Sequence, residues 1–198
     1  LTLSGAFTLL MISGYIDLSV GSAMSLNAVV FAWLILNGVP FLLAFPITLL
    51  LGIVLGTING YLVMKLRITP VIATLVTLLV FKGVALLIVP DGLSAIKSGA
   101  EQTMPAWIND YARQDVFLGL PLAFYVAVVL IAALVVVQRK TLLGKYAAAV
   151  GGNRTAAELA GIDAIKVVWL LYIIVGAFAA MAGMARASRV FPAPGGPM

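Results

Sequence analysis

Residues 41–64 read FLLAFPITLLLGIVLGTINGYLVM and contain no charged side chain. As an α-helix, this run of about 24 residues is roughly 36 Å long, which exceeds the hydrocarbon thickness of a bilayer. Gly52, Gly56 and Gly60 recur at every fourth position, a spacing of small residues that lets a neighbouring helix approach closely. The stretch therefore predicts a membrane-spanning helix that packs against another helix of its own bundle.

The composition of the whole chain also indicates a membrane protein. Hydrophobic residues make up 63% and charged residues 10%, against about 45–50% and 25% in soluble domains, and the mean hydropathy is +1.17. Each span needs roughly 20 apolar residues. The 198 residues therefore predict a single transmembrane domain over 1–198, an all-α polytopic membrane helix bundle with about five to six spans visible. The other apolar runs lie at 1–13, 18–36, 68–89, 116–137 and 167–185.

Charge and residue types exclude several classes of function. The formal net charge is +5, but the basic residues are few and scattered, so membrane lipid is an expected partner and nucleic acid is not. The chain contains neither Cys nor His, which rules out a thiolate metal site and removes the commonest general base. We therefore expect no metal and no cofactor. An integral membrane enzyme is disfavoured because the acids lie mostly in loops, where a catalytic constellation is hard to assemble.

Basic residues are distributed unevenly between the two sides of the predicted spans. Two of them, Lys97 and Arg113, fall on one side, or four if Arg186 and Arg189 are included. The positive-inside rule then predicts a cytoplasmic loop at 138–166 and an extracytoplasmic loop at 91–115. The seven on the other side are Lys65, Arg67, Arg139, Lys140, Lys145, Arg154 and Lys166.

Four polar residues within or beside the apolar runs are candidates for a translocation path or for a structural signature. Asp17, with Ser19 close behind it, is interpreted either as the N-cap of the 18–36 run or as a functional acid inside the membrane. Asn59 lies beside the glycine ladder and is placed to bond across helices. Lys82 interrupts the 68–89 run, and it either extends its ammonium to the membrane surface or faces an aqueous path.

The stretch 144–162, GKYAAAVGGNRTAAELAGI, is the longest polar interruption near the predicted cytoplasmic face. Thr155 and Glu158 have the spacing of a capping box, and Gly161 suits the left-handed residue that ends a helix. The pattern predicts a helix of little more than one turn over 156–160, preceded by a flexible segment at 151–153. So short a helix is marginal in water, so its own spans or a partner groove must hold it.

Several motifs carry a resemblance to one family. TLLGKYAAAVGGNRTAAELAGI (141–162) resembles the cytoplasmic coupling loop of ABC-transporter permeases that import ribose, xylose and related sugars. GYIDLSVGS (14–22) is similar to the GIDLSVGS signature of that family, and GTINGYLVMKLRITPVIATL (56–75) resembles its G-x-x-NG…K-x-R-I-x-P-x-I-x-TL run. Phe81-Lys82-Gly83 stands where the family usually has F-R-G. The four motifs occur in the family order over nearly the whole chain.

The resemblance implies a multi-pass, non-enzymatic permease of the bacterial inner membrane. Its implied partners are an ATP-binding subunit at the cytoplasmic face, a second permease copy and an extracytoplasmic solute-binding protein. The chain has no G-x-x-x-x-G-K-[ST] phosphate loop, which agrees with ATP hydrolysis on a separate subunit. Family permeases are longer, so we expect the chain to cover the middle of one. The residues implied in coupling to the ATP-binding subunit are Gly151, Gly152, Asn153, Thr155, Ala156, Ala157, Glu158 and Gly161.

Alternatives remain open within and outside transport. The substrate is a sugar or sugar-like solute in the first reading, and a branched-chain amino acid or another small solute in the second. A truncated fragment that inserts in the membrane without transporting is a third. For Glu158, a purely local capping role stands beside the coupling role.

Overall fold

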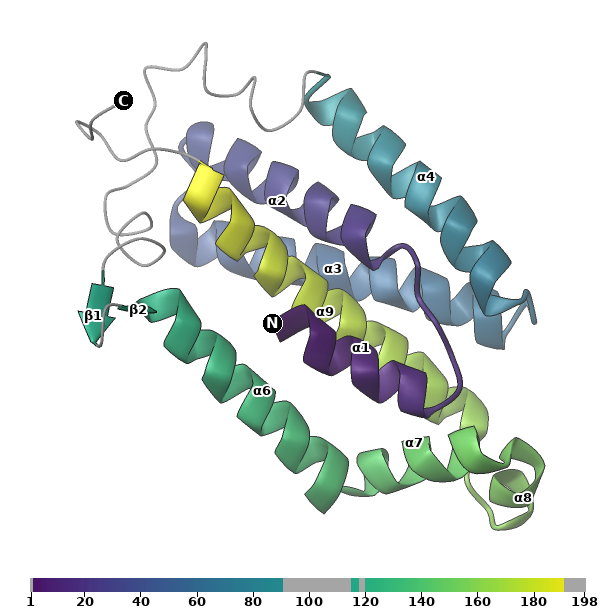
Figure 1. Cartoon of the computed structure of the whole chain (residues 1–198). Coiled ribbons are helices and arrows are strands. Elements are labelled where there is room, and N and C mark those ends of the chain that lie inside the picture. The colour runs from purple at the N-terminus through teal and green to yellow at the C-terminus, as the bar shows by residue number, and fades with distance from the viewer. Residues whose placement is uncertain (1, 91–114, 118–119, 191–198) are drawn as a thin grey trace.

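The computed structural model describes residues 2–90, 115–117 and 120–190 (Figure 1), and these residues are almost entirely helical. The all-α expectation is confirmed, and the helices are accompanied by one small antiparallel hairpin, β1 (Asp115–Phe117) with β2 (Leu120–Pro121). Most of the predicted extracytoplasmic loop, 91–114, lies outside the described residues. The helices are α1 (Thr2–Ile12), α2 (Val20–Leu36), α3 (Phe41–Met64), α4 (Pro70–Ile88), α6 (Leu122–Lys140), α7 (Leu142–Gly152), α8 (Arg154–Leu159) and α9 (Ala164–Val190).

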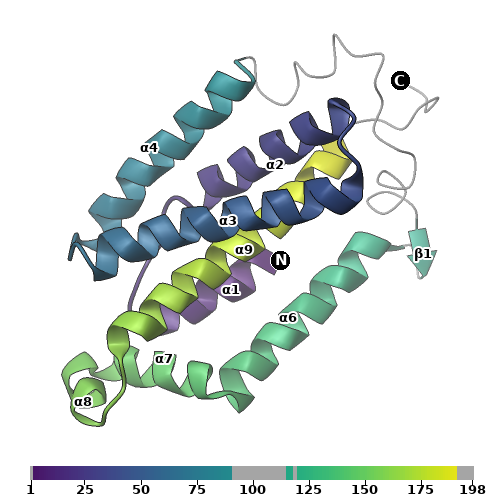
Figure 2. The same cartoon turned by 180° about the vertical axis from the view of Figure 1, so that it is seen from behind.

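Helix α9 forms the centre of the bundle. It packs most extensively on α3 and α2 and also contacts α1 and α7 (Figures 1 and 2). Helix α4 covers the outer side of α2, and α6 packs on α1. Residues that are far apart in sequence therefore build one core, in which Tyr172 of α9 is fully buried.

The prediction of a polytopic helical membrane protein is confirmed. Among the described residues, α3, α4 and α9 are long and apolar enough to cross a bilayer, and a fourth span is formed if α6 and α7, which meet at a 68° bend, are counted together. Helices α1 and α2 are apolar but shorter. Pro70 occupies the first turn of α4, where its missing N–H costs little.

The glycine ladder of α3 packs against α9, as its spacing predicts, and we call this contact the seam. A Cβ added to Gly52 would lie 2.4 Å from the carbonyl oxygen of Gly176, and one added to Gly56 would lie 2.3 Å from that of Tyr172. At Gly60 the neighbour is the ring of Trp169, whose indole N–H donates to the Thr57 carbonyl at 3.2 Å. The two backbones approach this closely because small residues face each other.

One end of the bundle collects the polar turns. The α3–α4 turn, α7, α8 and the start of α9 share this end in both views (Figures 1 and 2). Together with the last turn of α6, which contains Arg139 and Lys140, these elements carry the basic residues that the charge count places in the cytoplasm. The grouping is what a positive-inside arrangement requires.

Candidate functional site

The arm, residues 142–163, comprises α7, α8 and the turn that leads to α9. It leaves α6 through a sharp turn at Thr141, whose extended backbone ends α6 and whose hydroxyl accepts a hydrogen bond from the Gly144 amide at 3.5 Å. A side chain at Gly144 would collide with the backbone of Gln138, because an added Cβ would lie 2.0 Å from the Gln138 carbonyl oxygen. The T-x-x-G start of the motif therefore builds the 68° bend between α6 and α7.

The expected flexible segment at 151–153 is wrong for its glycines, because α7 continues through Gly152. Gly151 lies against the end of α1, where an added Cβ would be 1.9 Å from the Ile12 carbonyl oxygen. Gly152 has nothing within 4 Å of the same position. Gly151 is thus a point of close contact between the arm and the bundle. Sequence reasoning found the glycine pair but missed the helix that contains it.

The capping box predicted at Thr155 and Glu158 is also wrong. Helix α8 begins at Arg154, and Asn153 is its N-cap, whose side-chain oxygen accepts a hydrogen bond from the Ala156 amide at 3.0 Å. Asparagine caps at least as well as threonine, and with Asn153 as the cap the helix starts two residues earlier than the position predicted from Thr155. Glu158 is then too far along the helix to reach back to the cap.

The C-terminal end of α8 follows the prediction. Gly161 has φ +84, its amide donates to the Glu158 carbonyl, and the Ile162 amide donates to the Ala157 carbonyl, each at 3.0 Å. This pair of hydrogen bonds is a Schellman motif. It turns the chain sharply back toward α9.

Helix α8 is exposed over nearly its whole surface. Among the predicted coupling residues, Ala157 alone is buried, at 4% exposure, and the other seven are exposed. Leu159 is 85% exposed. Sequence reasoning missed Leu159, because an isolated leucine among alanines gives no signal of its orientation.

Arg154 joins α8 to the segment before α2. Its Nε donates to Glu158 Oε1 at 2.8 Å, and its Nη1 donates to the Tyr15 hydroxyl at 3.1 Å. The hydrogen bond to Glu158 raises the pKa of Arg154 further above its ordinary value, so the guanidinium stays charged. Both side chains of the ion pair are about half exposed, which limits its contribution to stability.

Asp17, Ser19 and Asn59 form a buried polar cluster. The Asp17 carboxylate accepts hydrogen bonds from the Ser19 amide at 2.8 Å and the Ser19 hydroxyl at 2.7 Å. The Asn59 amide nitrogen donates to Asp17 at 3.2 Å and to Ser19 Oγ at 2.7 Å. Asn59 therefore bonds across helices, as its position predicts, while its own side-chain oxygen has no partner among the described residues.

The N-cap interpretation of Asp17 is wrong. Helix α2 begins at Val20 and its N-cap position is Ser19. The Asp17 carboxylate accepts the amide two residues later, which closes a turn ahead of the helix and not the first turn of the helix itself. With all three residues buried, the cluster ties this turn to α3.

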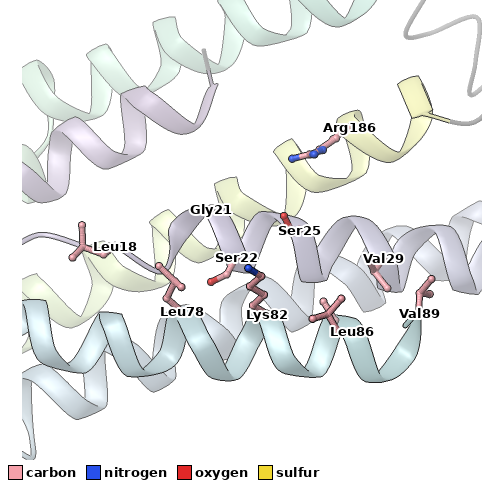
Figure 3. Close-up of a pocket in the computed structure, with 11 residues that line it drawn as sticks. Leu18, Gly21, Ser22, Ser25, Val29, Leu78, Lys82, Leu86, Val89 and Arg186 are labelled. Atoms are coloured by element: carbon pink, nitrogen blue, oxygen red, sulfur yellow. The ribbon is translucent and has the colours of Figure 1, made fainter. Parts of the chain in front are cut away.

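Lys82 lies beside a cavity of about 460 Å³ between α2, α4 and α9. Figure 3 shows its ammonium group directed toward α2 near Ser22, with Arg186 across the cavity on α9. Ser25 also contributes to the wall. Of the four polar residues singled out in the sequence, only Lys82 lines this cavity. The rest of the lining is mostly apolar: Leu18, Gly21, Val29, Leu78, Ala85, Leu86 and Val89.

The groups at the site are suited to hydrogen bonding and to apolar contact with a partner or a solute. Within the described part of the chain, no group of three or more Asp, Glu, His or Cys residues is arranged to hold a metal ion. An exposed arm, a buried polar cluster and a cavity with basic groups are distributed along apolar spans. These features define a multi-pass α-helical membrane protein.

The chain belongs to the family described as "Branched-chain amino acid transport system / permease component", whose model matches residues 1–194. The ribose import permease of Bacillus subtilis is 35% identical over 186 residues, which are 94% of this chain and 56% of that protein. The fructose import permease of Bifidobacterium longum is 31% identical over 191 residues, 96% of this chain and 52% of the relative. The predicted resemblance to sugar permeases is thereby confirmed.

A relative with a different named solute is similar at the same level. The autoinducer 2 import system permease of Yersinia pseudotuberculosis is 31% identical over 179 residues, 89% of this chain and 53% of that protein. The chain thus spans about half the length of the curated relatives it matches. No solved structure matches it.

Proposed function

We propose that this chain is the membrane-spanning permease part of an ATP-driven importer for a sugar or sugar-like small solute, located in a bacterial inner membrane. Family membership and the names of the sugar permeases above support the proposal. ATP hydrolysis takes place on a separate subunit at the cytoplasmic face. A second permease copy completes the pore, and an extracytoplasmic solute-binding protein delivers the solute.

The observation that carries this proposal is the exposure of α8. A six-residue helix is marginal alone, and α8 buries one residue, Ala157, while it presents Leu159 at 85% exposure. An exposed leucine on a capped, charged helix is suited to a pocket on a partner protein. We therefore assign α8 as the helix that docks on the ATP-binding subunit, with Leu159 as its apolar anchor and the seven exposed coupling residues around it.

Docking is tested by co-purification of the full permease with its ATP-binding subunit from membranes. Leu159→Ser should weaken the association by about tenfold or more, as expected when an apolar anchor is removed from a buried pocket. Leu142→Ser is the matched control, because Leu142 is 63% exposed on α7 and carries no docking role in this proposal. Equal association of the two variants would refute the assignment of α8.

Glu158 has a smaller role in the same assignment. Glu158→Ala breaks the ion pair that holds the Arg154 side chain, so ATP hydrolysis and uptake should become less tightly coupled while the association persists. The ratio of ATP hydrolysed to solute taken up measures this effect. An unchanged ratio would leave Glu158 with no role beyond its ion pair with Arg154.

The cavity beside Lys82 is our candidate for part of the solute path. Its 460 Å³ volume and its mixture of hydroxyl, basic and apolar groups suit a small polyhydroxy solute, because hydroxyl oxygens accept hydrogen bonds from Lys and Arg. Asp17, Ser19 and Asn59 are not among its lining residues, and they hold the turn before α2. Replacing Lys82 with Met should raise the KM for uptake, whereas Lys65→Met, at the α3–α4 turn, should leave it unchanged.

A permease for branched-chain amino acids is the second candidate, favoured by the description of the matching family. Membrane vesicles that carry the complete importer distinguish the two. Uptake of labelled ribose or fructose supports the first proposal, and uptake of labelled leucine supports the second. Absence of the ATP-binding subunit from the purified permease, together with no uptake of any of these, would favour a fragment that inserts without transporting.

A further inference from the structure

The segment between α1 and α2, residues 13–19, connects the arm to the cavity. Near its start, Tyr15 accepts a hydrogen bond from Arg154 of α8 at 3.1 Å. Near its end, Leu18 forms part of the cavity wall. Tyr15 and Leu18 are three positions apart, so the contact with the arm and the contact with the cavity lie on the same short stretch of backbone.

The middle of the segment is held by the bundle. The carbonyl oxygen of Ile16 accepts a hydrogen bond from the Tyr172 hydroxyl of α9 at 3.1 Å. The Asp17 side chain accepts one from Asn59 of α3 at 3.2 Å, and Asp17 and Tyr172 are both buried. Because these anchors fix the centre, a displacement at Tyr15 cannot be absorbed by free movement of the whole segment.

The start of the segment has a backbone that permits rotation. Gly14 adopts φ +82, a left-handed conformation that glycine enters without steric cost. Ser13 separates it from α1, and Gly151 of the arm lies close to the backbone of both Ile12 and Ser13. The arm therefore contacts the segment on both sides of Gly14, through the backbone at Ser13 and through the side chain of Tyr15.

We propose that residues 13–19 relay movement of α8 to the α2 wall of the cavity, with Tyr15 as the positioning residue that receives this movement from Arg154. The inference rests on the proposed function, in which ATP-driven closure of the partner displaces α8. The segment pivots at Ile16 and Asp17, so that Tyr15 and Leu18 move together. Packed cores switch between discrete arrangements and do not deform continuously, which allows a small displacement of α8 to reorient the first turn of α2.

The variant Tyr15→Phe isolates this contact. It removes the hydroxyl that Arg154 reaches while the ring keeps its packing against the core beside α1. The contact joins a half-exposed Arg154 to a partly buried tyrosine, so its removal should not prevent folding. Tyr146→Phe is the matched control, because Tyr146 is an exposed tyrosine on α7 whose hydroxyl makes no hydrogen bond with the described residues.

The absence of cysteine from this chain allows a direct readout at the cavity. Ser25→Cys places one thiol on the cavity wall, with any cysteine elsewhere in the full permease replaced by serine. The complete importer, reconstituted in lipid nanodiscs, is labelled with a membrane-impermeant maleimide, with and without ATP trapped by vanadate. Association with the ATP-binding subunit and its rate of ATP hydrolysis are measured on the same samples.

In the Ser25→Cys background, trapping ATP should change the labelling rate by about fivefold or more, the lower end of typical coupling between two sites. Adding Tyr15→Phe should abolish most of that change while association and hydrolysis are retained, and adding Tyr146→Phe should preserve it. A full ATP-dependent change in the Tyr15→Phe protein would overturn the relay. Loss of association in that protein would overturn it too, because the hydroxyl would then serve docking. If the background protein itself failed to bind the ATP-binding subunit, the proposed function would fail along with it.

Discussion

The seam and the arm are both rich in glycine and alanine, but they bury these residues to different extents. In the seam, Gly52 and Gly56 bring α3 so close to α9 that an added Cβ would lie within 2.4 Å of a backbone oxygen. In α8 of the arm, by contrast, only Ala157 is buried. The same residue types therefore serve close packing in one region and leave an open surface in the other.

The difference shows which part of the molecule is fixed and which is available to a partner. In the seam, α3 and α9 are in close contact along several helical turns. The arm contacts the bundle closely at Gly151 and is joined to the pre-α2 segment by the Arg154 hydrogen bond. Helix α7 of the arm packs Ala147 and Val150 into the core, whereas α8 buries Ala157 alone. An element with so few buried contacts shifts at lower free-energy cost than a packed core, which suits a helix that must respond to another protein.

The largest expected effect comes from breaking the seam. Gly56→Ala places a methyl group 2.3 Å from the Tyr172 carbonyl oxygen, and neither backbone can move without separating α3 from α9. We expect a loss of about 3 kcal/mol or more, at the upper end of overpacking effects, seen as a lower unfolding temperature in detergent. Gly83→Ala is the control, because nothing lies within 4 Å of its added Cβ. A Gly56→Ala protein as stable as Gly83→Ala would contradict the close packing of the seam.

A neighbouring pair in the arm gives a smaller effect and tests its point of attachment. Gly151→Ala places a methyl group 1.9 Å from the Ile12 carbonyl oxygen, whereas Gly152→Ala meets nothing within 4 Å. The ends of two helices can shift more easily than the middle of two spans, so we expect a loss of about 1–3 kcal/mol at Gly151. Protease digestion of the arm in the purified protein should accelerate for Gly151→Ala alone. Equal digestion rates would mean that the arm is not fixed at this residue.

The N-cap of α8 contributes to the local stability of this exposed helix. Asn153→Ala removes the side-chain acceptor of the Ala156 amide and should cost about 1 kcal/mol of local helix stability. Thr155→Ala should have almost no effect, because the Thr155 side chain makes no hydrogen bond with the part of the chain that the structure describes. Hydrogen exchange of the α8 amides measures both. If Thr155→Ala accelerated the exchange more than Asn153→Ala, the capping box that the sequence pattern predicts would be correct after all.

Much of the fold was predictable because it depends on composition and short repeats. Apolar runs predicted the spans, and the spacing of Gly52, Gly56 and Gly60 predicted close helix packing. The bend before α7 was not predictable from hydropathy, because it depends on the Thr141 turn and on the contact between Gly144 and Gln138. Helix α7 was not predicted either, because hydropathy does not indicate that a separate helix begins after this bend.

The candidate site was predicted in part. The motifs located α8 and its end at Gly161, since a left-handed glycine leaves a local signal. The cap was predicted at Thr155 because T-x-x-E matches a capping box, but Asn153, two positions earlier, suits the position equally well and is the residue that caps α8. The contact between Tyr15 and Arg154 joins residues 139 positions apart, and no local pattern reports such a pair.

The smallest expected effect concerns the boundary between the arm and the seam helix α9. The Asp163 carboxylate accepts a hydrogen bond from the Lys166 amide at 3.0 Å and pairs with the Lys166 ammonium at 2.9 Å. The amide bond, followed by the side-chain contact, holds the pKa of Asp163 below its ordinary value of 3.8. A carboxyl group whose pKa is lower in the folded state contributes stability above its unfolded pKa and loses it as the pH falls through the folded pKa.

The stabilising effect of Asp163 should therefore be complete at pH 6 and should fade as the pH falls below about 4, the range set by the unfolded carboxyl group. Unfolding temperatures of the wild type and Asp163→Ala should differ slightly at pH 6 and converge toward pH 3. Asp163→Asn separates charge from capping, because asparagine still accepts the Lys166 amide and carries no titrating charge. If the difference between wild type and Asp163→Ala were the same at both pH values, the charge of Asp163 would make no contribution at this boundary, and its side chain would act only as the acceptor of the Lys166 amide.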